Sequence, residues 1–264
     1  MPNPEPSKSL DLLGIKPVSE AINAVTQGTI QGASAFLSRI CLPAAEEFGL
    51  LLKDRVTSWR TANALKVTQK GEVKFNRYAG TASLHAPPNL VWRVVDSGSW
   101  SDEDQIQEMW GGLLASACSP DGRDDSNLIF INLLSQITTV QAKILNWICE
   151  KSQKYVSSAG WPYADDFRMP VAELKALTGV SDEHRLDREL DHLRSLELIS
   201  GETGGGFLPD SQEAGLSPTG FALHFYVRCQ GFIGSPIEFF SLLPKPNPQA
   251  AQPAQAQQQI SPST

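Results

Sequence analysis

The sequence predicts a mainly α-helical protein, with an N-terminal helical domain over residues 15–137 and a domain over residues 138–243 that combines helices with short strands. Two observations support this. In the first part, apolar residues recur every three or four positions, which is the spacing of one helix face. In the second part, helical segments alternate with Gly- and Pro-containing turns and short β-prone runs. Hydrophobic residues make up 41% of the 264 positions, so the chain can bury a core.

The two ends of the chain are expected to lie outside both domains. Residues 1–14 begin with a Pro-, Ser- and Asn-rich stretch and are predicted to be flexible. Residues 244–264 are rich in Pro, Gln and Ala and carry one charge, on Lys245. Such a segment buries too little apolar surface to offset its ordering entropy, so we expect it to be disordered.

The first predicted helix, residues 18–42, has small residues every four positions, at Ala24, Gly28 and Gly32. Small residues at this spacing allow a second helix to approach closely. One interpretation is a tight helix–helix contact in a soluble protein. The other is a segment that enters a membrane after a trigger, although its charged and polar residues argue against spontaneous deep insertion.

Residues 44–70 are predicted to form one long helix after a restart at Pro43, and Gly71 is expected to end it. Shorter helices are predicted over 89–96 and 128–136.

Between these two shorter helices, Ser101 and Asp104 resemble a capping box that opens another amphipathic helix. Trp110 lies on the apolar stripe of that helix, and we expect it to be a core residue.

The second domain is predicted to contain three helices before its strands. The first covers 140–156 and begins with a capping box made by Thr138 and Gln141. Pro170 suits the first turn of the second helix, and Ser181 suits the N-cap of the third.

A Gly-rich hairpin centred on 204–206 is expected to join a strand at Leu198-Ile199 to a return strand at Phe207-Leu208. A last helix is expected to open at Ser217-Pro218. This order of helices and hairpin is typical of a winged helix-turn-helix.

The charge on the predicted third helix argues against DNA binding. Residues 182–197 hold six acids and three arginines, and residues 200–213 add three acids and no base, for a combined net charge of −6. Lys and Arg contacts to phosphates supply most of the affinity for DNA. We therefore expect this domain to bind a protein, and a DNA-binding transcriptional regulator is the alternative.

Charge is also segregated in the first domain. Residues 53–93 hold eight bases and two acids, whereas residues 96–125 hold eight acids and one base. In one interpretation the two blocks face each other or form solvated faces. In the other, the basic block meets an anionic lipid or nucleic-acid surface.

No pattern in the chain indicates catalysis. Nucleotide-binding glycine loops, GxSxG and HExxH are absent, the four cysteines are far apart, and His184 and His192 are eight positions apart on one helix. We therefore predict no catalytic residue, no cofactor and no metal site, with an undetected enzyme such as a nuclease as a third possibility. The sequence has no signal peptide and no apolar run of about 18 residues, which favours a cytoplasmic protein.

Three stretches together resemble the abortive-infection alpha family, a bacterial family linked to phage resistance. They are EEFGLLLKDRVTSWRTANALK (46–66), SDEDQIQEMWGGLLASA (101–117) and FINLLSQITTVQAKILNWI (130–148), and the resemblance extends over about 43–230. The polar positions that match the family are candidate interaction or structural residues: Glu47, Asp54, Arg55, Arg60, Asn63, Asp102 and Glu103.

The resemblance implies a role in anti-phage defence and supplies no mechanism. Because no catalytic motif is present, we expect the protein to act through protein or membrane contacts, without covalent catalysis. The implied partner is a phage component or the product of a neighbouring defence operon, with peripheral contact at the inner membrane as an open alternative. For Arg55, Arg60 and Asn63 we expect a half-buried polar network that pairs with the acids of 101–108. A basic surface for lipid headgroups or a phage component is the other interpretation.

Overall fold

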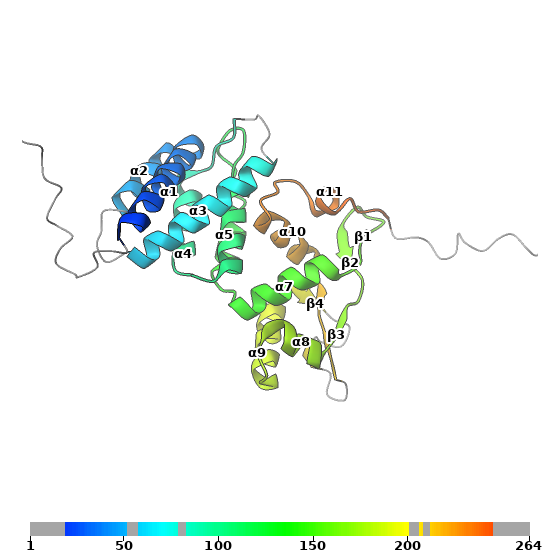
Figure 1. Ribbon diagram of the computed structural model, residues 1–264. Coiled ribbons are helices and arrows are strands. Elements are labelled where there is room, and N and C mark those ends of the chain that lie inside the picture. Colours follow the sequence, from blue (N-terminus) through cyan, green and yellow to red (C-terminus); the bar gives the residue numbers. More distant parts are fainter. Residues whose placement is uncertain (1–18, 52–57, 79–82, 201–205, 208–211, 245–264) are drawn as a thin grey trace, which may run out of the picture. The chain divides into compact units, whose positions relative to one another are not determined.

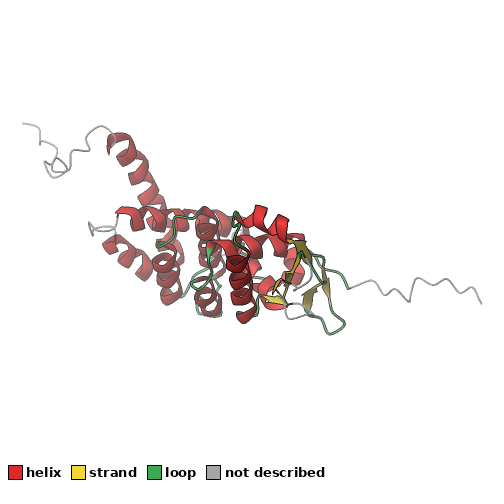
Figure 2. Cartoon of the chain, turned by 90° about the horizontal axis from the view of Figure 1, so that it is seen from below, coloured by secondary structure: helices red, strands yellow, loops and turns green. Residues whose placement is uncertain are grey.

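The computed structural model describes residues 19–51, 58–78, 83–200, 206–207 and 212–244 (Figure 1). The expected flexible N-terminus and nearly all of the expected disordered tail lie outside these ranges. The chain divides into unit 1, formed by Met1–Ala142 and Val227–Ile233, and unit 2, formed by Lys143–Tyr226 and Gly234–Thr264. The mainly helical class is confirmed, and the strands belong to unit 2 (Figure 2).

Unit 1 is built from six helices in the described part of the chain: α1 (Ser19–Ile40), α2 (Leu42–Leu51), α3 (Ser58–Tyr78), α4 (Pro88–Gly98), α5 (Asp104–Ser116) and α6 (Leu128–Leu134). It also includes the first residues of α7 (Thr139–Lys151) and the last of α10 (Gly220–Cys229). Helix α3 packs against both α1 and α5. Trp110 is 3% exposed, so its predicted place in the core is confirmed.

The expected helix end at Gly71 is wrong, because α3 continues to Tyr78. Gly71 instead allows α3 to approach α5 closely. A Cβ atom on Gly71 would lie 2.9 Å from Leu114 Cδ2 and 3.2 Å from the Gly111 carbonyl oxygen. Gly71 is therefore needed for the close packing of two helices. In the sequence, such a glycine cannot be distinguished from one that ends a helix.

Unit 2 combines the rest of α7 and α10 with further elements: β1 (Lys154–Val156), β2 (Pro162–Ala164), β3 (Arg168–Pro170), α8 (Val171–Thr178), α9 (Glu183–Ser195), β4 (Ile199–Ser200), β5 (Gly206–Phe207), β6 (Glu213–Gly215), β7 (Ser217–Pro218) and α11 (Pro236–Phe240). The strands form three small antiparallel sheets, with the orders β1-β2, β3-β6-β5 and β4-β7.

The predicted helix over 140–156 is too long, because α7 ends at Lys151 and the chain then forms β1. Tyr155 of β1 lies opposite Tyr163 of β2, with ring centroids 6.0 Å apart. Aromatic pairs across two strands stabilise an antiparallel ladder. Pairing of β1 with β2 is therefore favoured over an extension of α7 through residues 152–156.

The strand pairing also differs from the expected hairpin. Strand β4 pairs with β7, so Ser217-Pro218 is a strand and not the start of a helix. Strand β5 pairs with β6 instead of β4. Helix α10 begins only at Gly220. Thr219, the residue before it, accepts a hydrogen bond from the Ala222 N–H through its hydroxyl at 3.0 Å.

Helix caps were predicted with mixed success. The box at Thr138 and Gln141 is confirmed in both directions, with backbone-to-side-chain distances of 3.1 and 3.2 Å. The box at Ser101 is wrong, because the N-cap position of α5 is occupied by Glu103, which makes no side-chain cap. At α9 the cap is Asp182, one residue after the expected Ser181.

Candidate functional site

Ion pairs connect α3 and α5 beside the Gly71–Gly111 crossing. Lys70 Nζ lies 2.8 Å from Asp104 Oδ1 and 2.6 Å from Glu108 Oε1. Lys74 Nζ lies 3.3 Å from Glu108 Oε2. The interpretation that the basic and acidic blocks face each other is confirmed for these two lysines.

Burial and pairing shift the pKa values of these groups in different directions. Burial disfavours the charged form of Glu108, but hydrogen bonds and charge from Lys70 and Lys74 outweigh it and lower the pKa. Lys70 is also penalised by burial, and its hydrogen bonds to Asp104 and Glu108 raise the pKa overall. For Lys74, which is 7% exposed, burial dominates and lowers the pKa. The pairs therefore connect α3 to α5, and each of the two lysines is matched by a carboxylate.

A second polar network lies about two to three helix turns earlier on α3, at Arg60 and Asn63. Arg60 Nη2 donates to Asp96 Oδ1 at 2.6 Å, and Arg60 Nε donates to Ser99 Oγ at 3.0 Å. Asn63 Nδ2 donates to the Ser99 carbonyl at 3.2 Å, and Gln107 Nε2 donates to Asn63 Oδ1 at 3.3 Å. These side chains join α3, the end of α4 and the first turn of α5. The carboxylate that pairs with Arg60 is Asp96, which precedes the expected acids of 101–108.

The network fixes an exposed tryptophan. The guanidinium carbon of Arg60 lies 4.0 Å from the centroid of the Trp100 ring, in cation–π geometry. Trp100 is nevertheless 63% exposed. Sequence analysis missed Trp100 and Ser99, because residues 97–99 carry only the signal of a helix break.

A pocket of about 420 Å³ lies beside Trp100, within unit 1. It is lined by Ser97, Trp100, Ser101, Ile106, Trp110, Leu134, Ser135, Ile137, Thr138 and Thr139. Its lining therefore consists of aromatic and aliphatic side chains and of hydroxyls, with no charged side chain. This volume is within the range of small-molecule sites, and half of the lining residues are serines or threonines.

The other candidate polar residues are not brought to this site in the described part of the chain. Asp54 and Arg55 lie outside the described residues. Glu47 lies in α2, and its side-chain surroundings are also outside the described part. Asp102 and Glu103 are exposed before α5 and form no ion pair with a described residue.

The small residues of the first helix lie in α1, as expected. The surroundings of Ala24 and Gly28 are outside the described part. Gly32 is exposed, and a Cβ atom there would meet no atom within 4 Å. Helix α1 packs within unit 1 through buried residues such as Phe36 and Leu37. A contact role for the small-residue strip stays a prediction.

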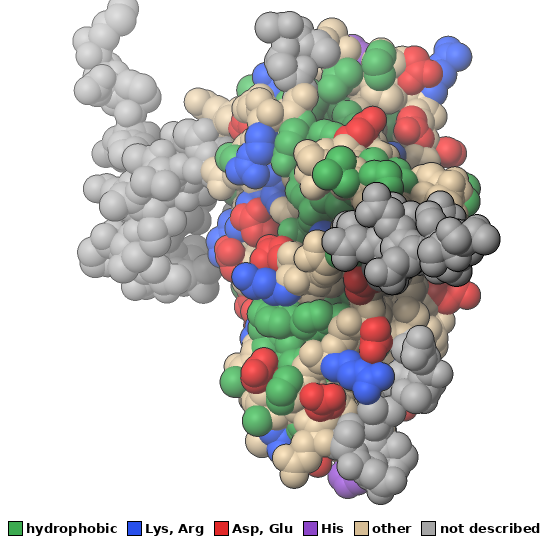
Figure 3. Space-filling view, turned by 90° about the vertical axis from the view of Figure 1, so that its right-hand side faces the viewer, with side chains coloured by type: hydrophobic (Ala, Val, Ile, Leu, Met, Phe, Trp, Pro, Cys, Tyr) green, Lys and Arg blue, Asp and Glu red, His purple; other side chains and the backbone are tan. Residues whose placement is uncertain are grey.

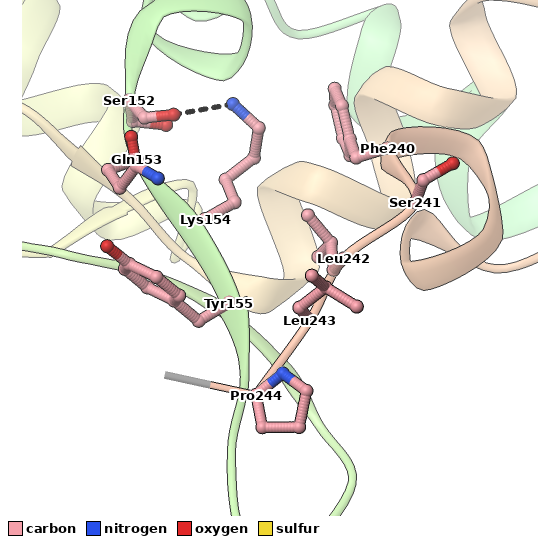
Figure 4. A pocket seen from close by; sticks show the side chains of 9 residues that line it. All are labelled: Ser152, Gln153, Lys154, Tyr155, Phe240, Ser241, Leu242, Leu243 and Pro244. Carbon is pink, nitrogen blue, oxygen red and sulfur yellow. Dashed lines mark hydrogen bonds between the residues drawn. The ribbon is translucent and has the colours of Figure 1, made fainter. Parts of the chain in front are cut away.

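Unit 2 holds a pocket of about 450 Å³ between β1 and the segment after α11 (Figure 4). Its one charged lining residue is Lys154, whose Nζ donates to the Ser152 carbonyl at 2.6 Å and to the Glu150 carbonyl at 3.3 Å. The same Nζ lies 4.6 Å from the Phe240 ring centroid, and burial lowers the pKa of the lysine. Lys154 thus caps the carbonyl end of α7, a place that favours a cation.

Two of the described cysteines are poor nucleophiles, and the described helices include no membrane-spanning candidate. Burial raises the pKa of the Cys118 and Cys149 thiols to about 12, and a protonated thiol is a poor nucleophile. No group of three His, Cys, Asp or Glu side chains within the described ranges is arranged to hold a metal ion. Of the helices that the structure describes, none has the length and apolar character needed to cross a membrane.

Comparison with known proteins gives one match. No curated protein and no solved structure matches the chain. The family model described as abortive infection alpha matches residues 63–212, which is more than half of the 264 residues. The match is shorter at both ends than the expected 43–230, and Arg60 falls just before it. It contains the α3–α5 crossing, Trp100 and the pocket beside it. The chain therefore belongs to the abortive infection alpha family.

Proposed function

We propose that this chain acts in anti-phage defence of the abortive-infection type, through non-covalent contact with a protein partner. The observation that carries the proposal is the family match over residues 63–212. The proposed partner is a phage component or the product of a neighbouring defence gene. The proposed location is the cytoplasm, with peripheral contact at the inner membrane as a variant of the same idea.

Unit 2 offers a suitable contact residue, Trp161, which follows the turn between β1 and β2. The turn is held by a hydrogen bond from the Ser157 N–H to the Trp161 carbonyl at 2.8 Å and by another from the Trp161 N–H to Ser157 Oγ at 3.0 Å. Trp161 is 70% exposed. A large aromatic side chain on a fixed turn loses little conformational entropy on binding, and tryptophan is enriched among the residues that dominate interfaces.

The order α7, α8, α9, antiparallel strands and α10 supports the proposal of a winged-helix-like unit. The charges on this unit support a contact with protein and not with DNA. Two of the arginines on α9 already pair with acids of the same helix, Arg194 with Asp191 at 2.6 Å and Arg185 with Glu189 at 3.7 Å. On the face drawn in Figure 3, Lys and Arg side chains are interspersed with Asp and Glu. A duplex would require a concentrated basic surface.

The test is a phage challenge of a sensitive bacterial strain that expresses the full chain with its neighbouring genes. We expect fewer plaques, and at high phage-to-cell ratios we expect the infected cells to stop growing without releasing phage. Trp161→Ala should lose this protection while keeping the wild-type unfolding midpoint. Ile129→Ala removes a similarly exposed apolar side chain of α6, 60% exposed, and should keep the protection.

Plaque counts that do not change with the gene present would contradict the defence role. Tight, strongly salt-dependent binding of the full chain to duplex DNA would contradict the protein-contact role and favour the regulator instead.

A further inference from the structure

The pocket beside Trp100 is shaped by four helix ends of unit 1. Ser97 and Trp100 come from the end of α4, and Ser101 and Ile106 flank the start of α5. Leu134 and Ser135 end α6, and Thr138 and Thr139 begin α7. Helix ends place backbone and side-chain polar groups around the rim, while Ile106, Trp110 and Leu134 are buried and provide an apolar floor.

Trp100 is prepared for stacking before any ligand arrives. Arg60 covers one face of its ring, and Arg60 is itself held by Asp96 and by Ser99 Oγ. Ser99 is fully buried and donates to the Asp96 carbonyl at 2.6 Å, so the group that holds Arg60 is itself hydrogen-bonded. Arg60 covers one face of the ring, yet Trp100 is 63% exposed and lines the pocket, so we take the other face as the surface open to a ligand. A preordered aromatic ring pays little entropy when it binds a second ring.

The polar groups of the pocket favour an uncharged ligand with hydrogen-bonding edges. Within the described part of the chain, the hydroxyls of Ser97 and Thr139 form no hydrogen bond with another residue. Each can donate and accept. No charged side chain lines the pocket, and Arg60, which contacts the Trp100 ring, already pairs with Asp96 at 2.6 Å. A charged ligand would therefore lose its hydration without gaining an ionic partner in the pocket lining.

We propose that this pocket binds an uncharged planar heterocycle of the size of a nucleobase, such as the base of a free nucleoside, stacked on the accessible face of Trp100. The hydroxyls of Ser97 and Thr139 then contact the polar edge of the ring, and Ile106 and Leu134 contact its apolar part. Stacking on tryptophan tolerates any base, because each has a π face. This inference goes beyond the proposed function, since it concerns a small ligand of unit 1 and not the partner contact of unit 2.

The test measures binding of adenosine and uridine to the full chain by saturation-transfer NMR and titration calorimetry. We expect saturable binding to the wild type and binding at least about tenfold weaker to Trp100→Ala, as stacking contributions of this kind imply. Ser135→Trp keeps Trp100 but fills the pocket from an exposed position, and should weaken binding similarly. Trp161→Ala removes a similarly exposed tryptophan of unit 2 and should bind like the wild type.

Three outcomes would overturn the proposal. One is the absence of saturable binding at millimolar nucleoside. Another is wild-type binding by both Trp100→Ala and Ser135→Trp. The third is stronger binding of N-acetyltryptophanamide than of either nucleoside, which would make the pocket a receptor for a protein side chain. These measurements need no phage, so their failure is distinguishable from failure of the defence role.

Discussion

At the residue scale, Arg60 has three partners that would all lose a contact if it were removed. It neutralises Asp96, satisfies the buried hydroxyl of Ser99 and supports the ring of Trp100. Because the Arg60 side chain is only 19% exposed, water could replace these contacts only in part. Asp96 is 42% exposed and can be solvated by water without Arg60, so the cost falls mainly on the buried hydroxyl of Ser99, which loses its donor.

Arg60→Ala is therefore expected to lower the free energy of unfolding by about 1–3 kcal/mol, measured by urea denaturation. The tryptophan emission of the native state should also shift, because Trp100 loses its support. Arg93→Ala removes an exposed arginine of α4 and is the matched control, for which we expect a change below about 0.5 kcal/mol. Identical denaturation curves for Arg60→Ala and wild type would show that the network does not stabilise unit 1.

The sequence predicted that Arg60 and Asn63 join a polar network, because polar residues beside apolar ones on an amphipathic helix lie at the edge of a core. It did not predict Ser99 or Asp96 as partners. Those contacts depend on where α4 ends in space relative to α3, and no periodicity encodes that distance.

At the element scale, glycines control how closely the helices of unit 1 can pack. A Cβ atom on Gly111 would lie 2.8 Å from the Gly71 nitrogen, and one on Gly112 would clash with the backbone of Cys229 at the end of α10. These obstacles are backbone atoms, which cannot move aside like a flexible side chain. The helices would have to separate and expose the core between them.

Gly112→Ala is thus expected to destabilise the protein by about 3 kcal/mol or more, seen as a lower unfolding midpoint. Gly32→Ala provides a control of opposite sign. Gly32 lies inside α1 with open space around it, so alanine should stabilise the helix by about 0.5–1 kcal/mol. If both variants shift the midpoint in the same direction, the close packing at Gly112 is not what determines the result.

At the scale of the whole molecule, helix content was predictable and strand pairing was not. Helical periodicity is local, and the capping box at Thr138 and Gln141 is a contact between residues three apart. The pairing of β4 with β7 joins residues about eighteen positions apart through strands of only two residues. A strand of two residues is too short to show the alternation of apolar and polar side chains that would identify its partner strand. The same limit applies to Trp100, whose pocket collects residues from four helix ends.

The facing charge blocks lead to a prediction about pH. Paired carboxylates stabilise the folded state when they are ionised, and Glu108 is the acid shared by Lys70 and Lys74. Its folded-state pKa lies below the reference value of 4.5. Its contribution is therefore fully present above about pH 5 and is lost as the pH falls below 4.5 through the folded-state pKa. On the alkaline side Lys70, with a raised pKa, loses stability as the pH rises, whereas Lys74, with a lowered pKa, gains it, so the acid side is the clearer test.

Glu108→Gln should lower the free energy of unfolding by about 1–2 kcal/mol at pH 7, because it leaves the buried Lys74 without its carboxylate. The variant should also lose less stability than the wild type between pH 5 and pH 3, since part of the acid-sensitive pairing is already gone. Denaturant titrations across that range measure both effects. Glu103→Gln, at an exposed acid before α5, should follow the wild-type curve. Parallel acid-side slopes for Glu108→Gln and wild type would mean that the ion pairs across the α3–α5 crossing contribute nothing to the acid sensitivity of the fold.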